Sequence, residues 1–344
     1  MNPEANSPKM LKFVGPQREW RWGIAIYLYL AGMGAGSFII GMFTHWKGFG
    51  FSLPPKVLTL WGIPFEFSKT VLLWGPIFVA IGAPFLILDL GKKLRFYTAC
   101  LNPRTSWLAR GFFILSIFIV LGLIVFGVAA LSFRWIGHPP VFWRLLEIIS
   151  IIFAFATAIY TGILLQSVKY VPMWNTPLLP FLFLASALST GSMGIILTTM
   201  AYGLLSSQGG SFPQLVNILI KVEQVFILLE AWVFISYLFS KYRLKDQGET
   251  SVRLLVAGDL RFLFWGGIVC VGFIFPTVLE YLYSHYPQYP VLLFATGVLL
   301  LAGGFFLRLG LLASGIKEQL PMHKLIEMKM NMSAFQRRKS CRAR

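Results

Sequence analysis

The chain has 344 residues, of which 57% are hydrophobic, 16% are aromatic and only 12% are charged. This composition excludes a water-soluble globular protein, which needs a larger share of charged residues on its surface. The formal net charge of +17 would indicate nucleic-acid binding in a soluble protein, but an excess of Lys and Arg on one side of a bilayer accounts for it equally well. We therefore expect an integral membrane protein with no nucleic-acid partner.

Apolar runs long enough to cross a hydrocarbon core of about 30 Å recur along the whole chain. They predict about eight transmembrane helices, near residues 23–45, 70–90, 112–133, 145–168, 178–205, 213–240, 260–283 and 291–314. Because the runs are apolar on every face, helices rather than barrel strands satisfy the backbone. The expected fold class is an all-α integral membrane protein.

A cluster of glycines lies inside the first run, at Gly32, Gly34 and Gly36. No Lys-Ser or Lys-Thr pair follows it, as a phosphate-binding loop would require. Small residues at this spacing are typical of helices that pack closely in membranes. We predict close helix packing here rather than a nucleotide site.

A compact polar loop separates the second and third runs. It contains Asp89-Leu90-Gly91-Lys92-Lys93-Leu94-Arg95-Phe96, then Asn102-Pro103-Arg104-Thr105-Ser106-Trp107, and it closes with Arg110-Gly111. Asp89 precedes Lys93 by four residues and lies near Arg95 and Arg110 in the sequence, so we expect a charge network that ties the loop to the helix ends. Such a network could be purely architectural.

Acidic residues within the apolar runs are candidates for function, because a charge at the bilayer centre costs about 2.5–3.5 kcal/mol on insertion scales. Glu230 is the deepest of them, and Glu223 lies seven residues before it, on the same helix face. This spacing is compatible with a proton relay. Near the span ends, Glu66 with Lys69 and Arg144 with Glu147 are spaced to form ion pairs, and Glu280 ends the seventh run, so structural ion pairs are the competing interpretation.

Cysteine and histidine usage argues against a metal or haem in this chain. The cysteines are isolated, at Cys100, Cys270 and Cys341, so the chain cannot ligate an iron–sulfur cluster by itself. The histidines lie at span ends, in loops or in the tail, at His45, His138, His285 and His323. A bis-histidine haem needs imidazoles on facing helices at matching depth, and no such pair is predicted.

Basic residues alternate with the predicted spans so that most of them lie on one side of the membrane. They are found in the N-terminus, the polar loop, Lys169, the segment 241–261 and the tail from Lys317 onward. The positive-inside rule then places both termini in the cytoplasm. The tail forms an amphipathic segment on anionic lipids, docks an acidic partner, or is a disordered basic extension.

The polar loop, with its Asp-Leu-Gly-Lys, Arg-Phe, Asn-Pro-x-x-Ser-Trp and Arg-Gly elements, resembles the signature loop of the polysulfide reductase membrane-subunit family, also called NrfD-like proteins. Further similar features are Glu19-Trp20-Arg21-Trp22, Tyr160-Thr161-Gly162, Pro172-Met173-Trp174-Asn175 and Leu307-Arg308-Leu309. The similarity therefore covers nearly the whole chain.

The resemblance implies a multi-pass anchor subunit in a prokaryotic cytoplasmic membrane. Two four-helix bundles would occupy residues 1–175, with a quinone pocket, and residues 176–314, and residues 315–344 would form a basic cytoplasmic tail. Such a subunit binds a quinone of the menaquinone or ubiquinone type and contributes that site, rather than the catalytic core, to an oxidoreductase. It exchanges electrons with a ferredoxin-like iron–sulfur subunit, which usually connects to a molybdopterin subunit.

The resemblance also implies roles for individual residues. The quinone pocket would involve Ile24, Tyr27 and Tyr160, although some relatives have an amide and a histidine where Ile24 and Tyr27 stand. The position of acidic residues in the sequence, rather than the resemblance, makes Asp89, Glu223 and Glu230 candidates for the proton path. The basic charge of the polar loop makes Lys92, Lys93, Arg95, Arg104 and Arg110 candidates for docking the partner subunit.

Alternatives stay open on orientation and on function. Many relatives place the pocket and the partner outside the membrane, so either this complex faces the cytoplasm or the basic loops dock an acidic partner and mislead the positive-inside rule. The chain could also be a proton-coupled secondary transporter that uses Glu223 and Glu230, or a purely structural anchor. Without the resemblance, packing with a satisfied hydroxyl would be the favoured interpretation of Tyr27 and Tyr160.

Overall fold

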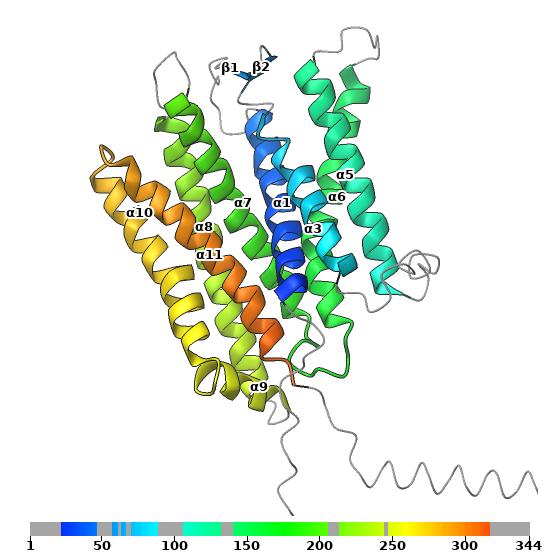
Figure 1. Ribbon diagram of the computed structural model, residues 1–344, viewed down its shortest axis with the longest axis vertical. Helices are drawn as coiled ribbons and strands as arrows, with labels where there is room; N and C mark the ends of the chain where they lie inside the picture. The colour runs from blue at the N-terminus through cyan, green and yellow to red at the C-terminus, as the bar shows by residue number, and fades with distance from the viewer. Residues whose placement is uncertain are drawn as a thin grey trace, which may run out of the picture.

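The structure is a computed structural model that describes residues 22–46, 57–60, 63–66, 70–88, 106–131, 140–205, 213–243 and 247–316. Long helices run roughly along one common axis (Figure 1). In chain order the elements are α1 (Trp22–His45), β1 (Val57–Leu60), β2 (Ile63–Glu66), α3 (Trp74–Leu88), α5 (Trp107–Leu131), α6 (Pro140–Gln166), α7 (Leu178–Leu205), α8 (Pro213–Arg243), α9 (Gln247–Val256), the π-helix η3 (Leu263–Ile274), α10 (Phe275–His285) and α11 (Pro290–Ala313).

Six helical segments of the described chain are long and apolar enough to cross a membrane. They are α1, α5, α6, α7, the continuous η3–α10 segment and α11. Helix α3 has only 15 residues, and α8 carries Lys221, Glu223 and Glu230 in its length. The all-α class and the multi-pass architecture are confirmed, whereas the total of eight spans and their division into two bundles stay predictions.

One short β-hairpin departs from the all-helical expectation. Strands β1 and β2 pair antiparallel, with Val57 opposite Glu66 and Leu60 opposite Ile63. The hairpin lies beyond the upper end of α1 in Figure 1. The sequence predicts no strand here because four-residue strands between two apolar runs leave almost no periodic signal.

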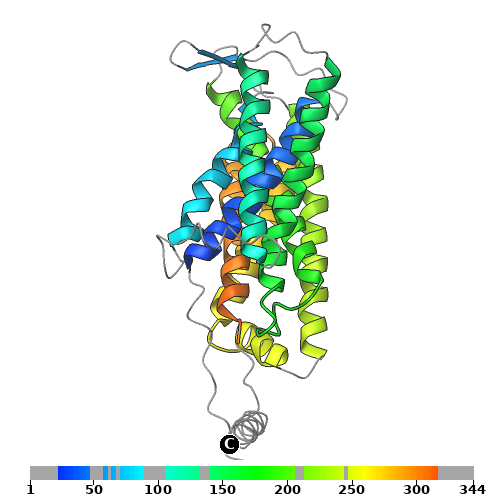
Figure 2. The ribbon, with the colours of Figure 1, turned by 90° about the vertical axis from the view of Figure 1, so that its right-hand side faces the viewer.

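Helix α1 is the centre of the fold. It packs against α3, α6, α7 and α11, and Figures 1 and 2 show it inside the bundle. Around it, α5 packs on α6, α8 packs on α7, and η3 packs on α11. Most residues of α1 are consequently buried within the protein.

The glycine cluster makes these close contacts possible. A Cβ atom on Gly36 would overlap the carbonyl group of Ala187 on α7, and one on Gly34 would lie 2.7 Å from the carbonyl oxygen of Gly75. On the facing helix, a Cβ on Gly191 would overlap the backbone of Gly36. The prediction of close helix packing through small residues is therefore confirmed.

The seventh apolar run is a π-helix followed by an α-helix. The change to α-helix comes at Phe275, and Pro276 follows it in the first turn of α10. Within η3, Gly272 lies against the backbone of Gly303 on α11. The π-helical turn thus brings η3 close to α11 beside the acidic residues described below.

The loop between α6 and α7 holds the lower ends of α8 and α11. Trp174 donates its indole N–H to the carbonyl oxygen of Leu311 at 2.8 Å, and the Tyr237 hydroxyl donates to the carbonyl oxygen of Met173 at 2.8 Å. All four residues are buried. The Pro-Met-Trp-Asn motif is therefore a structural joint between the two halves of the chain.

Lys241 strengthens the same joint. It is 4% exposed, and its ammonium group donates to the carbonyl oxygens of Pro172 and Asn175 at 2.7 and 2.9 Å. The sequence places Lys241 among the basic residues of a loop, but the structure places it at the end of α8 with a structural role.

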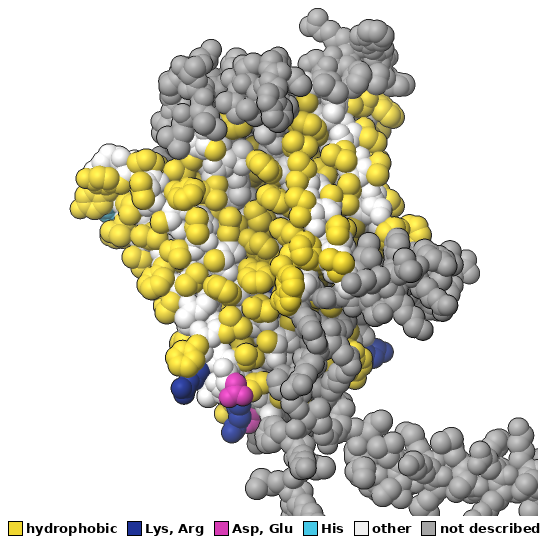
Figure 3. Space-filling view, viewed as in Figure 1, with side chains coloured by type: hydrophobic (Ala, Val, Ile, Leu, Met, Phe, Trp, Pro, Cys, Tyr) yellow, Lys and Arg dark blue, Asp and Glu magenta, His cyan; other side chains and the backbone are white. Residues whose placement is uncertain are grey.

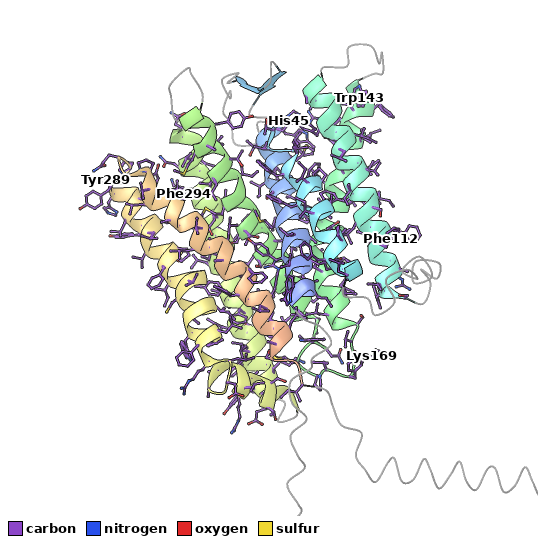
Figure 4. All side chains as sticks on the ribbon, viewed as in Figure 1. His45, Phe112, Trp143, Lys169, Tyr289 and Phe294 are labelled. Carbon is purple, nitrogen blue, oxygen red and sulfur yellow. The ribbon has the colours of Figure 1, made fainter. Side chains whose placement is uncertain are left out.

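The lateral surface is apolar, as expected for a protein surrounded by lipid (Figure 3). The sticks in Figure 4 show Phe112, Tyr289 and Phe294 at the perimeter of the bundle, where they are exposed by 40%, 58% and 59%. On the face drawn in Figure 3, the charged side chains that the structure describes gather at the lower end. An apolar belt with charges at its end is the surface that a bilayer requires.

Candidate functional site

Two buried tyrosines meet where α1 and α6 approach each other. Tyr27 is fully buried and Tyr160 is 2% exposed, and the two phenol groups are close enough to interact electrostatically. Neither hydroxyl has a hydrogen-bond partner among the residues that the structure describes. A buried hydroxyl without a partner is costly, so these two are poised for a ligand or a water molecule that can complete the bonds.

A glycine on α5 makes room for this arrangement. A Cβ atom at Gly111 would overlap the ring and the hydroxyl of Tyr160. Gly111, the glycine of the Arg-Gly pair that closes the polar loop, therefore leaves space for the Tyr160 phenol between α5 and α6. This contact joins positions 49 residues apart in the sequence, and only the structure reveals it.

Ile24 lies one helical turn before Tyr27 and is 7% exposed. The spacing of three residues puts both side chains on the same face of α1. Helix α3 covers this region, since Gly82 lies against Leu30 and near the carbonyl oxygen of Tyr27. The structure thus brings Tyr27 and Tyr160 together as expected, with Ile24 as an apolar neighbour on α1.

The tyrosine pair lies near the lower end of the bundle in Figure 1. Tyr27 is five residues into α1 and Tyr160 is six residues before the end of α6, so each lies within about two turns of that end. Arg110, in the first turn of α5 at the same end, stacks over the Trp107 ring at 4.5 Å. Lys169 extends from the same end (Figure 4).

Several predicted residues lie outside the described part of the chain. These are Asp89 of the candidate proton path and Lys92, Lys93, Arg95 and Arg104 of the candidate docking surface. Their roles stay predictions. Helix α3 ends at Leu88, immediately before Asp89, and its lower end lies near that of α5 in Figure 1.

A second polar cluster occupies the other half of the molecule, between α7, α8 and α11. Glu230 is 5% exposed and has Ser186 as a hydrogen-bonding neighbour and Arg308 as its nearest positive charge. Arg308 is fully buried, and its Nη1 donates to the Ser186 hydroxyl at 2.9 Å and to the Gly304 carbonyl oxygen at 2.8 Å. A deep glutamate is thus neutralised in part by a deep arginine.

The Arg308 guanidinium also contacts aromatic faces. Its carbon atom lies 5.5 Å from the ring centroid of Tyr29 and 5.4 Å from that of Phe183, within the range of cation–π attraction. On α1, the absence of a side chain at Gly32 leaves space for Nη2. Arg308 therefore lies at the junction of α1, α7 and α11, which the sequence signalled only through the Leu-Arg-Leu feature.

Glu223 lies two turns from Glu230 along α8, as predicted. It is fully buried, and the Ser189 hydroxyl donates to its Oε1 at 3.1 Å. Its other neighbour is Glu280 of α10, which is 1% exposed. A structural ion pair at the span end is the sequence-based interpretation of Glu280, but the structure places it against another carboxyl group.

A small cavity lies beside Glu230. Its lining residues come from α7, α8, η3 and α11: Thr190, Glu230, Gly272, Phe273, Leu300, Gly303, Gly304 and Leu307. The cavity has room for about one water molecule, and Glu230 and Thr190 are the polar residues of its lining.

The predicted ion pair of Arg144 and Glu147 is confirmed. Arg144 Nη1 lies 3.2 Å from Glu147 Oε2, and the indole N–H of Trp46 donates to the same oxygen at 2.6 Å. His45 Nε2 lies 3.8 Å from the other oxygen of Glu147, and Figure 4 shows His45 at the upper end of α1. This cluster fastens α1 to α6 at the end opposite the tyrosine pair. The second predicted pair, Glu66 with Lys69, falls outside the described side chains.

Within the described ranges, no group of three or more His, Cys, Asp or Glu residues is arranged to hold a metal ion. The two polar clusters therefore consist of hydroxyl, carboxyl and guanidinium groups. The tyrosine pair can donate hydrogen bonds to carbonyl oxygens of a ligand, and the acidic cluster can hold or release protons.

The amino-acid sequence matches a known family of membrane proteins. Residues 11–318 match the family described as polysulphide reductase, NrfD. The chain therefore belongs to the NrfD polysulphide reductase family of multi-pass membrane proteins.

Two relatives illustrate the relationship. The chain is 29% identical over 313 residues to the C subunit of polysulfide reductase from Wolinella succinogenes, covering 86% of this chain and 94% of the relative. It is 26% identical over 317 residues to protein NrfD of Escherichia coli, again covering 86% and 94%. The resemblance noted in the signature loop thus extends along nearly the full length.

Proposed function

We propose that this protein is the membrane subunit of a bacterial oxidoreductase complex and that it binds a quinone or quinol at the Tyr27–Tyr160 pair. Membership of the NrfD family and the similarity to a polysulfide reductase subunit support the role as a subunit of a larger enzyme. The two buried hydroxyls without partners in the described protein are the single observation that carries the quinone assignment.

The chemistry of the pair suits a quinone. A quinone presents two carbonyl oxygens on an apolar ring, and each phenol can donate one hydrogen bond to such an oxygen. Burial by α3 and α5 keeps water from competing for these donors, which strengthens each hydrogen bond. Ile24 supplies apolar surface on the same face of α1.

A bound quinone would supply two-electron redox chemistry, and the protein would supply orientation and protons. Tyr27 and Tyr160 hold the ligand and polarise its oxygens. Asp89, which follows the end of α3, is our candidate for proton exchange with the solvent at this end. Glu223 and Glu230 lie on α8 among residues of α7, α10 and α11, and Glu223 is part of a separate site that is described below.

Electrons require a partner at the same end of the molecule. We propose that a ferredoxin-like iron–sulfur subunit, connected to a molybdopterin subunit, docks where α5 begins. Arg110 is the described member of the candidate docking set, and Lys92, Lys93, Arg95 and Arg104 complete it in the sequence. Basic side chains would attract an acidic partner and accelerate its association.

Orientation follows from the same charges. Most of the described Lys and Arg residues lie at the end that holds the tyrosine pair, namely Arg110, Lys169, Lys241, Arg243, Arg253 and Arg261, whereas Arg144 lies at the opposite end. We propose that this end and both termini face the cytoplasm of a prokaryotic cell, according to the positive-inside rule. The partner subunits would then lie on the cytoplasmic side of the membrane.

Tyr160→Phe and Tyr27→Phe test the quinone site. Each removes one hydrogen bond, which is worth about 0.5–1.5 kcal/mol, so each single variant should weaken quinone binding about 2- to 10-fold. Thermal stability and assembly should not change, since neither hydroxyl bonds to the described protein. Quinone binding and quinol oxidation would be measured on the purified complex.

Tyr289→Phe is the matched control, because Tyr289 is 58% exposed at the perimeter of the bundle. It should leave quinone binding unchanged. A Tyr27→Phe, Tyr160→Phe double variant with wild-type quinone affinity would contradict the proposal and favour a purely structural anchor.

A further inference from the structure

Two carboxyl groups meet in the half of the molecule that the tyrosine pair does not use. Glu223 of α8 is fully buried and Glu280 of α10 is 1% exposed, and the two carboxyl groups are direct neighbours. A hydrogen bond between two carboxyl groups needs a proton, since two carboxylates offer only acceptors. The proximity of the two carboxyl groups therefore indicates that one of them carries a proton.

The remaining oxygens of the pair have few donors. The Ser189 hydroxyl donates to Glu223 Oε1 at 3.1 Å. Glu223 Oε2 and both oxygens of Glu280 are buried without a hydrogen-bond partner among the described residues, and the Gln224 side chain is a neighbour of Glu280. The pair therefore has few fixed donors in the described protein.

Among the described residues, no positive charge compensates the negative charge of the two carboxyl groups. The charged groups that act on Glu223 are Glu280 and Glu230, which are both acidic. The buried cation of this region, Arg308, acts on Glu230. Two adjacent carboxylates in an apolar interior without a cation would repel each other strongly, and one bound proton removes that repulsion.

We propose that Glu223 and Glu280 form an exchangeable proton-binding site, in which the two carboxyl groups hold a single proton between them. Binding converts two carboxylates and one proton from water into a carboxyl group hydrogen-bonded to a carboxylate. Release returns the proton to water and leaves both groups negative. The site is separate from the tyrosine pair and does not depend on quinone binding there.

The position of Glu223 and Glu280 suits proton exchange with the surface of the protein. Glu280 lies five residues before the end of α10 at His285, about 8 Å along the helix axis from the upper end in Figure 1. In the other direction, Glu230 lies about 10 Å along α8, beside the cavity that has room for one water. The pair therefore lies between the upper end of α10 and the deeper carboxyl group of Glu230.

Dicyclohexylcarbodiimide provides a direct test, because this apolar reagent modifies protonated carboxyl groups in apolar surroundings. The full-length protein would be treated in its native membrane at neutral pH, and peptides would be analysed by mass spectrometry. We expect one adduct per chain, on Glu223 or on Glu280, and slower labelling as the pH rises. Glu249, which pairs with Arg253 at 2.8 Å in α9, should not react.

The Glu280→Gln variant separates a shared proton from simple burial. The amide removes one negative charge and can donate a hydrogen bond to Glu223, so both effects favour the carboxylate of Glu223. The pH of half-maximal labelling of Glu223 should fall by about one unit or more. Glu249→Gln is the matched control and should leave that pH unchanged.

Three results would overturn the proposal. One is the absence of an adduct on both glutamates of the wild-type protein, and another is an adduct on both glutamates of the same molecule, which would mean two independent protons. The third is protection by sodium ions at constant ionic strength, which would make the pair a metal-cation site. Quinone affinity is not a readout of this experiment, so its failure would leave the tyrosine site unaffected.

Discussion

The tyrosine pair and the acidic pair solve the same physical problem in different ways. Tyr27 and Tyr160 are neutral donors whose hydroxyls stay unpartnered in the described protein, whereas Glu223 and Glu280 are acceptors that need a proton to tolerate each other. Unpaired donors favour a ligand with carbonyl oxygens, and facing acceptors favour a proton. The type of unsatisfied atom, more than the depth of burial, therefore indicates what a membrane-embedded site binds.

The glycine contact between α1 and α7 supports both regions, and its disruption should have the largest effect. Gly36→Ala places a methyl group on the Ala187 carbonyl, so backbone atoms must separate. We expect the free energy of unfolding to fall by about 3 kcal/mol and the amount of protein in the membrane to fall strongly. Thermal unfolding in detergent measures the loss of stability. Gly127→Ala on α5 is the control, because nothing lies within 4 Å of the Cβ position at Gly127. Equal behaviour of the two variants would contradict the packing account.

Lys241→Met tests whether the buried charge of Lys241 stabilises the fold without contributing to either binding site. The variant removes two charge-assisted hydrogen bonds to the α6–α7 loop and should cost about 2 kcal/mol. Quinone affinity and carbodiimide labelling should both stay at the wild-type level. Thermal unfolding measures the effect, and exposed Lys169→Met serves as control. A selective loss of labelling would instead link Lys241 to the acidic pair.

Gly111→Ala perturbs the tyrosine pair and leaves the acidic pair intact. The added methyl group displaces the Tyr160 phenol, so quinone affinity should fall about tenfold, which corresponds to about 1.4 kcal/mol. Labelling of Glu223 or Glu280 should be unchanged, because α5 does not contribute to that pair. Gly127→Ala on the same helix should alter neither property. Wild-type quinone affinity in Gly111→Ala would indicate that the phenol position does not matter.

The sequence predicted features that depend on local composition. The apolar runs identified the helices, the glycine spacing identified the close contact of α1, and the spacing of seven placed Glu223 and Glu230 on one face of α8. The pair of Tyr27 and Tyr160 came from the family resemblance. These signals reside in single helices or in motifs that are short and continuous.

Contacts between distant helices could not be predicted in the same way. The fit of Gly111 around Tyr160, the contact of Glu223 with Glu280 and the burial of Arg308 all depend on how helices pack. A glutamate near a span end has the same sequence signature whether it faces an arginine or another glutamate. The π-helix of η3 likewise leaves no periodic signal in a segment that is apolar on every face.

The central claim is that the two regions bind different ligands independently. The most direct test measures quinone affinity and carbodiimide labelling on the same membranes, for the Tyr27→Phe, Tyr160→Phe double variant and for Glu280→Gln. We predict that the double variant loses quinone affinity and keeps wild-type labelling, while Glu280→Gln shifts the labelling to lower pH and keeps wild-type affinity. Loss of quinone affinity in Glu280→Gln, with full affinity in the tyrosine double variant, would contradict the account.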